Sequence, residues 1–201
     1  MSGQSKQNPP EFEQARSQIL SAKFRSELFT EETTSPDRIS PFSVALAAGV
    51  KHSATSSADT DSEAGVGRFI LLYDPESANE WGEKFRVVCY AQAPLETEIG
   101  ADPFITDVTW SWLTDALSSS GAEYKNIAGT ATIITSTGFG GLEAQGTGSQ
   151  IELRASWTPM GEHFSAHAVA WSHLLCFLAG FPEEEGAISI DAYRIKNKKS
   201  T

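Results

Sequence analysis

One stretch of the chain, residues 150–159 (QIELRASWTP), restricts the possible fold more than any other part of the sequence. Apolar side chains at its odd positions alternate with polar ones at its even positions, and this period of two is typical of a β-strand with one buried face. A glycine-rich connector, residues 138–148, precedes this stretch, and residues 129–136 precede the connector. Together these segments predict a long β-hairpin in which Trp157 faces the core.

Similar patterns predict further strands and helices around this hairpin. Residues 68–73 (RFILLY) are apolar on both faces, which predicts an inner strand covered on both sides. Alternation over residues 84–93 predicts a second strand next to it. Apolar residues at helical spacing predict helices over residues 104–117 and 165–179, and residues 187–190 could form a last short strand.

Towards the N-terminus the sequence predicts helices. Apolar residues recur every three or four positions from residue 11 to about Phe29, as in an amphipathic helix. Ser40 and Pro41 then suit the N-cap and first position of a second, short helix that ends near Gly49. The polar residues 51–65 have nothing to bury, so we expect a flexible linker there.

The order of these elements predicts a single α+β domain over residues 11–191, with a disordered segment at 1–10 and a basic disordered tail at 192–201. Two strands followed by a helix occur twice. The antiparallel sheet could therefore come from a ββα–ββα duplication, with both helices on one face and the N-terminal helices in addition. Two unrelated ββα units would share as few residues, so both interpretations stay open.

Charge and cysteine usage limit the classes of function. The net charge of −11 and pI near 4.8 disfavour direct binding to nucleic acid or to an anionic membrane surface. No apolar run is long enough to span a bilayer, and the first residues contain no apolar signal region. Cys89 and Cys176 lie in apolar runs, as buried thiols do in a reducing compartment. We therefore expect a cytoplasmic protein.

Sequence patterns that accompany catalysis or cofactor binding are weak. His163 and His167 are four residues apart, as metal ligands on one helical turn would be, but no nearby carboxylate or cysteine completes a set. The glycine-rich connector joins two strands, whereas a phosphate-binding loop needs a helix N-terminus behind it. Ser156 lies within a predicted strand and not in a nucleophile elbow. We predict no metal and no cofactor, and we favour a protein without enzymatic activity.

Four polar residues form the candidate binding site: Arg86, Tyr90, Glu152 and Arg154. Each lies mid-strand, and its parity places it on the face opposite the predicted core. Arginine recognises carboxylates and phosphates through a bidentate fork, so this face could bind an anion or a partner peptide. The alternative is a structural one, in which Glu152 and Arg154 pair with each other.

Residue motifs add a family resemblance. The chain resembles an actinobacterial family of uncharacterised proteins, domain of unknown function 3000, in four segments: GRFILLYDP (67–75), VTWSWLTDAL (108–117), ELRASWTP (152–159) and HAVAWSHLLC (167–176). The resemblance extends from about Phe12 to Asp191. It implies a common lineage and a one-domain organisation, and it implies no particular reaction.

Two functional hypotheses follow. The first is a non-enzymatic interaction or regulatory protein that binds a protein partner through the polar sheet face or a tryptophan-rich surface, since the chain has five Trp residues. The second is a small enzyme or binding domain that holds an anionic small molecule with Arg86 and Arg154. A deep pocket would favour the second and a flat patch the first. Either protein could also form a homo-oligomer.

Overall fold

The computed structural model describes residues 8–35, 39–51 and 60–181 of the chain. The predictions for the chain ends, for most of the 51–65 linker and for a strand at 187–190 lie outside these residues. The elements, in chain order, are α1 (Pro10–Leu20), β1 (Leu28–Thr33), β2 (Phe42–Val50), β3 (Val66–Tyr73), α2 (Ala78–Trp81), β4 (Phe85–Leu95), α3 (Thr97–Gly100), α4 (Ile105–Ser119), β5 (Tyr124–Thr137), the 3-10 helix η1 (Gly140–Gln145), β6 (Thr147–Pro159) and α5 (Phe164–Leu178).

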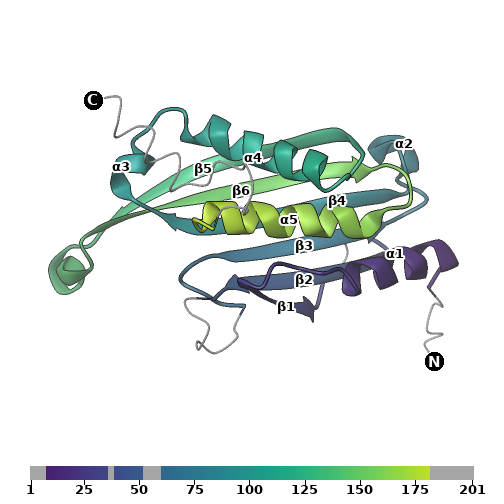
Figure 1. Cartoon of the computed structure of the whole chain (residues 1–201), viewed down its shortest axis with the longest axis horizontal. Coiled ribbons are helices and arrows are strands. Elements are labelled where there is room, and N and C mark those ends of the chain that lie inside the picture. The colour runs from purple at the N-terminus through teal and green to yellow at the C-terminus, as the bar shows by residue number, and fades with distance from the viewer. Residues whose placement is uncertain (1–7, 36–38, 52–59, 182–201) are drawn as a thin grey trace.

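The strands form one six-stranded sheet in the order β1-β2-β3-β4-β6-β5, and every neighbouring pair is antiparallel. Helices α1, α4 and α5 lie on the same face of this sheet (Figure 1). We call that face the front. The rear face consists of the even-numbered residues of β3, β4, β6 and of β5 from Ala128 on, and the odd-numbered residues of β1 and β2. Before the register shift in β5 the parity is reversed, so Lys125, opposite Thr158, also lies on the rear face. This architecture confirms the predicted single α+β domain.

The four predicted strands and the two predicted helices are present, with longer bounds for some. In β6, Ile151, Leu153 and Trp157 are fully buried on the front face, which confirms the predicted parity of this strand. Strand β5 starts earlier than predicted and shifts register between Lys125 and Ala128. The rear face of β3 is more open than predicted at Arg68, which is exposed, whereas Leu72 on the same face is buried.

The N-terminal helix is shorter than predicted, because it ends at Leu20 and not near Phe29. At its end the Ser21 hydroxyl donates a hydrogen bond to the Ser17 carbonyl oxygen over 2.8 Å. Such local side-chain bonds compete with continuation of the helix. Leu28 still reaches the core, but it does so from strand β1, which pairs with β2.

The predicted helix over residues 41–49 is wrong, since this segment forms strand β2. A short apolar run of this kind suits a buried strand as well as a buried helix, and pairing decides between them. Here β1 and β3 pair with β2 on its two sides, and the residues from Val44 to Val50 are all buried. Ser40 is no N-cap, because its hydroxyl donates to the carbonyl oxygens of Phe42 and Tyr73.

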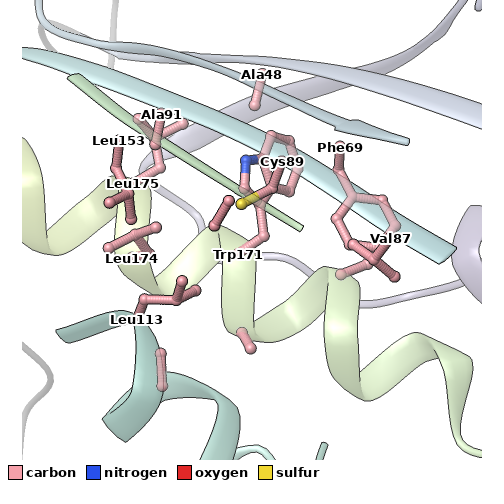
Figure 2. Close-up of a cluster of buried hydrophobic side chains, with 14 of the residues drawn as sticks. Ala48, Phe69, Val87, Cys89, Ala91, Leu113, Leu153, Trp171, Leu174 and Leu175 are labelled. Carbon is pink, nitrogen blue, oxygen red and sulfur yellow. The ribbon is translucent and has the colours of Figure 1, made fainter. Parts of the chain in front are cut away.

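The core lies between the sheet and the front-face helices. Trp171 of α5 packs beside Phe69 and Cys89 on the sheet, and Leu113 of α4 approaches from the neighbouring helix (Figure 2). Burying a large apolar side chain stabilises a fold by roughly 1.5–3 kcal/mol, so this cluster accounts for much of the packing energy. None of the described helices has both the length and the apolar character that crossing a membrane requires.

Candidate functional site

The structure places all four predicted site residues on the rear face. Tyr90 of β4 and Arg154 of β6 are direct cross-strand partners, and Glu152 precedes Arg154 by two residues on the same face. Arg86 lies four residues from Tyr90 along β4, a separation of roughly 13 Å at the usual rise of a strand. The structure therefore brings three of the predicted residues together and sets Arg86 apart.

Arg154 is the exposed centre of this group. Its guanidinium carbon lies 5.6 Å from the centroid of the Tyr90 ring, within the range of a cation–π contact. Its Nε lies 2.8 Å from Oε1 of Glu152, and the side chains are 67% and 14% exposed respectively. Exposed ion pairs contribute about 0–1 kcal/mol to folding. The pair therefore orients the arginine more than it stabilises the fold.

The Tyr90 hydroxyl is a hydrogen-bond donor. It donates to Oε1 of Gln92, and the Gln92 amide donates in turn to Gln150. Burial, together with the nearby Glu152 carboxylate, raises the pKa of Tyr90 above its usual value. The phenol therefore stays protonated at neutral pH and is poorly suited to act as a general base.

Arg86 has internal partners. Its terminal nitrogens donate to the Asn126 carbonyl oxygen at 3.0 Å, to the Thr158 hydroxyl at 3.0 Å and to the Ser156 hydroxyl at 2.7 Å. Burial lowers the pKa of the Arg86 guanidinium, although an arginine remains charged at any physiological pH. These bonds connect β4 to β6 and to the start of β5. We therefore build the candidate site without Arg86.

Arg68 belongs to the site, and sequence reasoning missed it. It lies directly opposite Tyr90 on β3, is exposed, and has Nη1 3.5 Å from the Thr33 hydroxyl. Arg68, Tyr90 and Arg154 thus form one row across β3, β4 and β6, which we call the arginine row. The sequence contained one signal for this residue: Arg68 and Ile70 are two positions apart and so lie on the same face of the strand. The apolar run around Arg68 nevertheless suggested a strand covered on both faces.

The histidines and cysteines have structural surroundings. His163 precedes α5 and is exposed, whereas His167 is buried and its Nδ1 accepts a hydrogen bond of 3.0 Å from Trp157 Nε1. Burial lowers the pKa of His167 to about 4 and raises that of Cys89 and Cys176 to about 12. In the described part of the chain, no three His, Cys, Asp or Glu side chains lie close enough to hold a metal ion.

A depression of about 390 Å³ lies at one end of the sheet, between α1 and the loop that joins β6 to α5. Phe85 and Phe164 contribute apolar surface there, and the Lys84 amine donates to the Glu11 carboxylate over 2.8 Å. Glu162 adds a further carboxylate to its lining. The depression contains none of the four predicted site residues, and its one lysine is already paired.

Comparison with known proteins places the chain in a family without assigning it a reaction. No curated protein and no solved structure matches it. The model of one protein family does match, over residues 8–188, which is most of the chain and includes all the described strands and helices. The chain therefore belongs to the family described as "Protein of unknown function (DUF3000)".

Proposed function

We propose that this protein is a cytoplasmic, non-enzymatic interaction protein whose rear sheet face binds an acidic segment of a partner protein. One observation carries the proposal: the arginine row lies on the sheet face opposite helices α1, α4 and α5. Two free, buried cysteines support the cytoplasmic setting, because such thiols are typical of reducing compartments.

The spacing of the arginine row suits an extended peptide. Neighbouring strands lie about 4.8 Å apart, so Arg68 and Arg154 flank Tyr90 with roughly 10 Å between their strands. An extended chain covers this distance in about three residues. Two carboxylates two or three residues apart could therefore each meet one guanidinium fork, with the Tyr90 ring beneath the peptide between them.

Charge favours an acidic partner at this face. In the described strands the rear face carries four basic residues (Arg68, Arg86, Lys125 and Arg154) and two glutamates (Glu31 and Glu152). The whole chain has a net charge of −11. Complementary charge steers association and like charge disfavours it, so an acidic segment would be attracted here and repelled by most other surfaces.

Apolar side chains beside the row add contact area. Ile70 and Val88 are cross-strand partners one step along the rear face from Arg68 and Tyr90, and Val88 is 37% exposed. Aromatic residues and arginine are enriched at protein interfaces. A partner segment with acidic and apolar side chains on one face would fit this combination.

The alternative, an anionic small molecule held by Arg86 and Arg154, has weaker support. The guanidinium group of Arg86 already donates to three acceptors of the protein. The backbones of the two arginines also lie roughly 13 Å apart along the sheet, so both side chains would have to extend towards each other to contact one small anion.

A peptide array tests the proposal directly. Labelled protein is applied to extended peptides of graded Asp and Glu content, and bound label is measured at low and high salt. We expect binding to rise with acidic content and to weaken with salt, because the attraction is electrostatic. Arg68→Gln with Arg154→Gln should weaken binding at least tenfold, or about 1.4 kcal/mol.

Arg16→Gln is a control for the loss of one arginine elsewhere, because Arg16 is also paired with a glutamate but lies on α1, on the front of the molecule. This variant should bind like the wild type. The proposal fails if Arg68→Gln with Arg154→Gln binds the acidic peptides as well as Arg16→Gln does, or if binding is independent of acidic content. Thermal unfolding of each variant shows that the fold is intact.

A further inference from the structure

Strand β5 is the last strand of the sheet on its side. It pairs with β6 at Tyr124 and Lys125 and, after the register shift, from Ala128 to Thr137, and no described strand lies along its other side. In an antiparallel ladder alternate residues direct their backbone N–H and C=O groups away from the partner strand. About half of the residues in this stretch therefore present unpaired backbone groups at the edge, which is a template for adding another strand.

Beyond the register shift between Lys125 and Ala128, the β5–β6 hairpin lacks the charges and prolines that commonly protect an exposed edge. Between Asn126 and Gln150 the only charged residue is Glu143, and this segment contains no proline. Charged residues make up 20% of the whole chain. Natural edge strands are commonly short or carry charges or proline, which prevents unintended pairing. From Ala128 to Thr137 this edge is uncharged and rich in Thr and Ile, which favour strand pairing.

The opposite edge of the same sheet shows the contrast. Strand β1 has six residues against 14 for β5, and it carries Glu31 and Glu32. The hairpin also projects beyond the rest of the sheet and ends in η1 (Figure 1). At this tip Phe139 is 79% exposed and Leu142 is 56% exposed. Low charge with exposed apolar residues is the composition of an interface core.

We infer that the β5 edge is a self-association surface, at which the β5 strands of two copies of this chain pair antiparallel about a two-fold axis. Such pairing is closed, because each copy presents the same edge to the other. It joins the two sheets into one continuous twelve-stranded sheet, since each copy contributes six strands.

Charge placement favours a second copy as the occupant. Lys125, which pairs with Glu83 of its own chain at 2.9 Å, lies at the start of β5, and Glu143 lies in η1 beyond its end. Antiparallel pairing brings the start of one strand beside the far end of the other, so each lysine lies towards the partner's glutamate end. The uncharged stretch between them brings no like charges together, although each chain carries a net charge of −11. This interface does not involve the arginine row.

The first test is the mass of the full chain in solution. Sedimentation equilibrium over a wide concentration range should give twice the chain mass of 21.7 kDa at the upper end of that range. Thr132→Lys with Ser136→Lys should return the mass to that of one chain. Both residues are exposed on β5, and Thr132 lies opposite Glu152, so the lysines are compatible with the monomer fold.

Ser111→Lys with Ser118→Lys is the matched control, because it adds the same charge at exposed positions of α4. It should keep the mass of two chains. Amide hydrogen exchange gives a second readout: outward-facing β5 amides should exchange slowly in the wild type and rapidly in Thr132→Lys with Ser136→Lys. The inference is overturned if the wild type has the mass of one chain throughout, or if the β5 lysines leave the mass and the β5 exchange unchanged.

Discussion

The unit made of β3, β4 and α4 and the unit made of β5, β6 and α5 each set a glycine beneath a tryptophan of the other unit's helix. A Cβ added to Gly67 of β3 would lie 2.9 Å from the Trp171 ring of α5, and one added to Gly129 of β5 would lie 2.8 Å from the Trp110 ring of α4. The sheet order β3-β4-β6-β5 is the order that a two-fold axis between β4 and β6 would produce. This reciprocal packing is what the duplication hypothesis expects.

The surroundings of the two tryptophans differ. Trp171 is fully buried, lies edge-on to Phe24 and donates its indole N–H to the Tyr90 carbonyl oxygen at 3.0 Å. Trp110 is only half-buried. Phe24 comes from the segment between α1 and β1, and no segment in the described part of the chain lies beyond β5 in the same way. The N-terminal segment thus covers Trp171 on the β3 side of the sheet, while the β5 side ends at an open edge.

The sharpest test of this comparison replaces each tryptophan by alanine. Removing a fully buried aromatic side chain costs about 3–5 kcal/mol, so Trp171→Ala should unfold at a much lower denaturant concentration. Trp110→Ala should lose clearly less stability, because its side chain is already partly exposed to water. Urea unfolding followed by circular dichroism measures both. Equal losses would show that the two sites are equivalent despite their surroundings.

A second difference between the units is sensitivity to acid. In α5 the buried His167 can be protonated, whereas the buried polar residue Thr109 of α4 does not titrate. The folded-state pKa of His167 is about 4, below the ordinary 6.5, so the unfolded chain takes up the proton first. The contribution of neutral His167 to the free energy of unfolding is therefore fully present above pH 6.5. About 3 kcal/mol of it is lost as the pH drops towards 4.

Urea midpoints measured across this pH window check the expectation. In His167→Gln the decrease in stability at low pH that comes from His167 should be absent. In His163→Gln the decrease should remain, because His163 is exposed. An unchanged pH slope in His167→Gln would show that other groups cause the acid sensitivity.

The two glycines should also differ on substitution. Overpacking a filled site costs roughly 1–3 kcal/mol, and both Gly67→Ala and Gly129→Ala should fall in this range. The larger loss is expected for Gly129→Ala, because its Cβ would meet the Arg154 backbone oxygen, which cannot turn aside as a side chain can. Gly148→Ala is the control, since nothing lies near its added Cβ. Thermal unfolding that ranks Gly67→Ala as the more destabilised variant would contradict this reasoning.

The smallest effect is expected at the register shift, which β5–β6 has and β3–β4 lacks. Asn126 there has a positive φ of 52°, and Arg86 donates to its carbonyl oxygen. Arg86→Gln should therefore cost about 1–2 kcal/mol, since hydrogen bonds to a charged group are among the stronger ones. Amide exchange should quicken near Asn126 and stay unchanged in β3. Uniform exchange across both strands would contradict a local role.

Sequence reasoning reached the elements whose patterns are local. Alternation correctly predicted which residues of β4 and β6 face the core, including Trp157. Helical spacing correctly predicted α4 and α5. Sequence reasoning failed at β2, because the short run of small apolar residues there has no distinctive period. Pairing with β1 and β3 decides its conformation, and such pairing is not visible within the segment itself.

The candidate site was predictable only in part for the same reason. Parity placed Tyr90, Glu152 and Arg154 on one face, but the cross-strand register that sets Arg68 opposite Tyr90 depends on which strands are neighbours. The contacts of Arg86 depend on the register shift near Asn126, and no local sequence pattern predicts this shift. Binding by these residues stays a prediction.

The bond from the Trp171 indole to the Tyr90 carbonyl oxygen has a practical consequence. Tyr90 directs its ring to the rear face, while its backbone oxygen is held by a ring inside the core. A ligand that displaces the Tyr90 side chain would disturb this indole proton without touching it. The indole N–H resonance of Trp171 is therefore a built-in spectroscopic reporter of occupancy on the opposite side of the sheet.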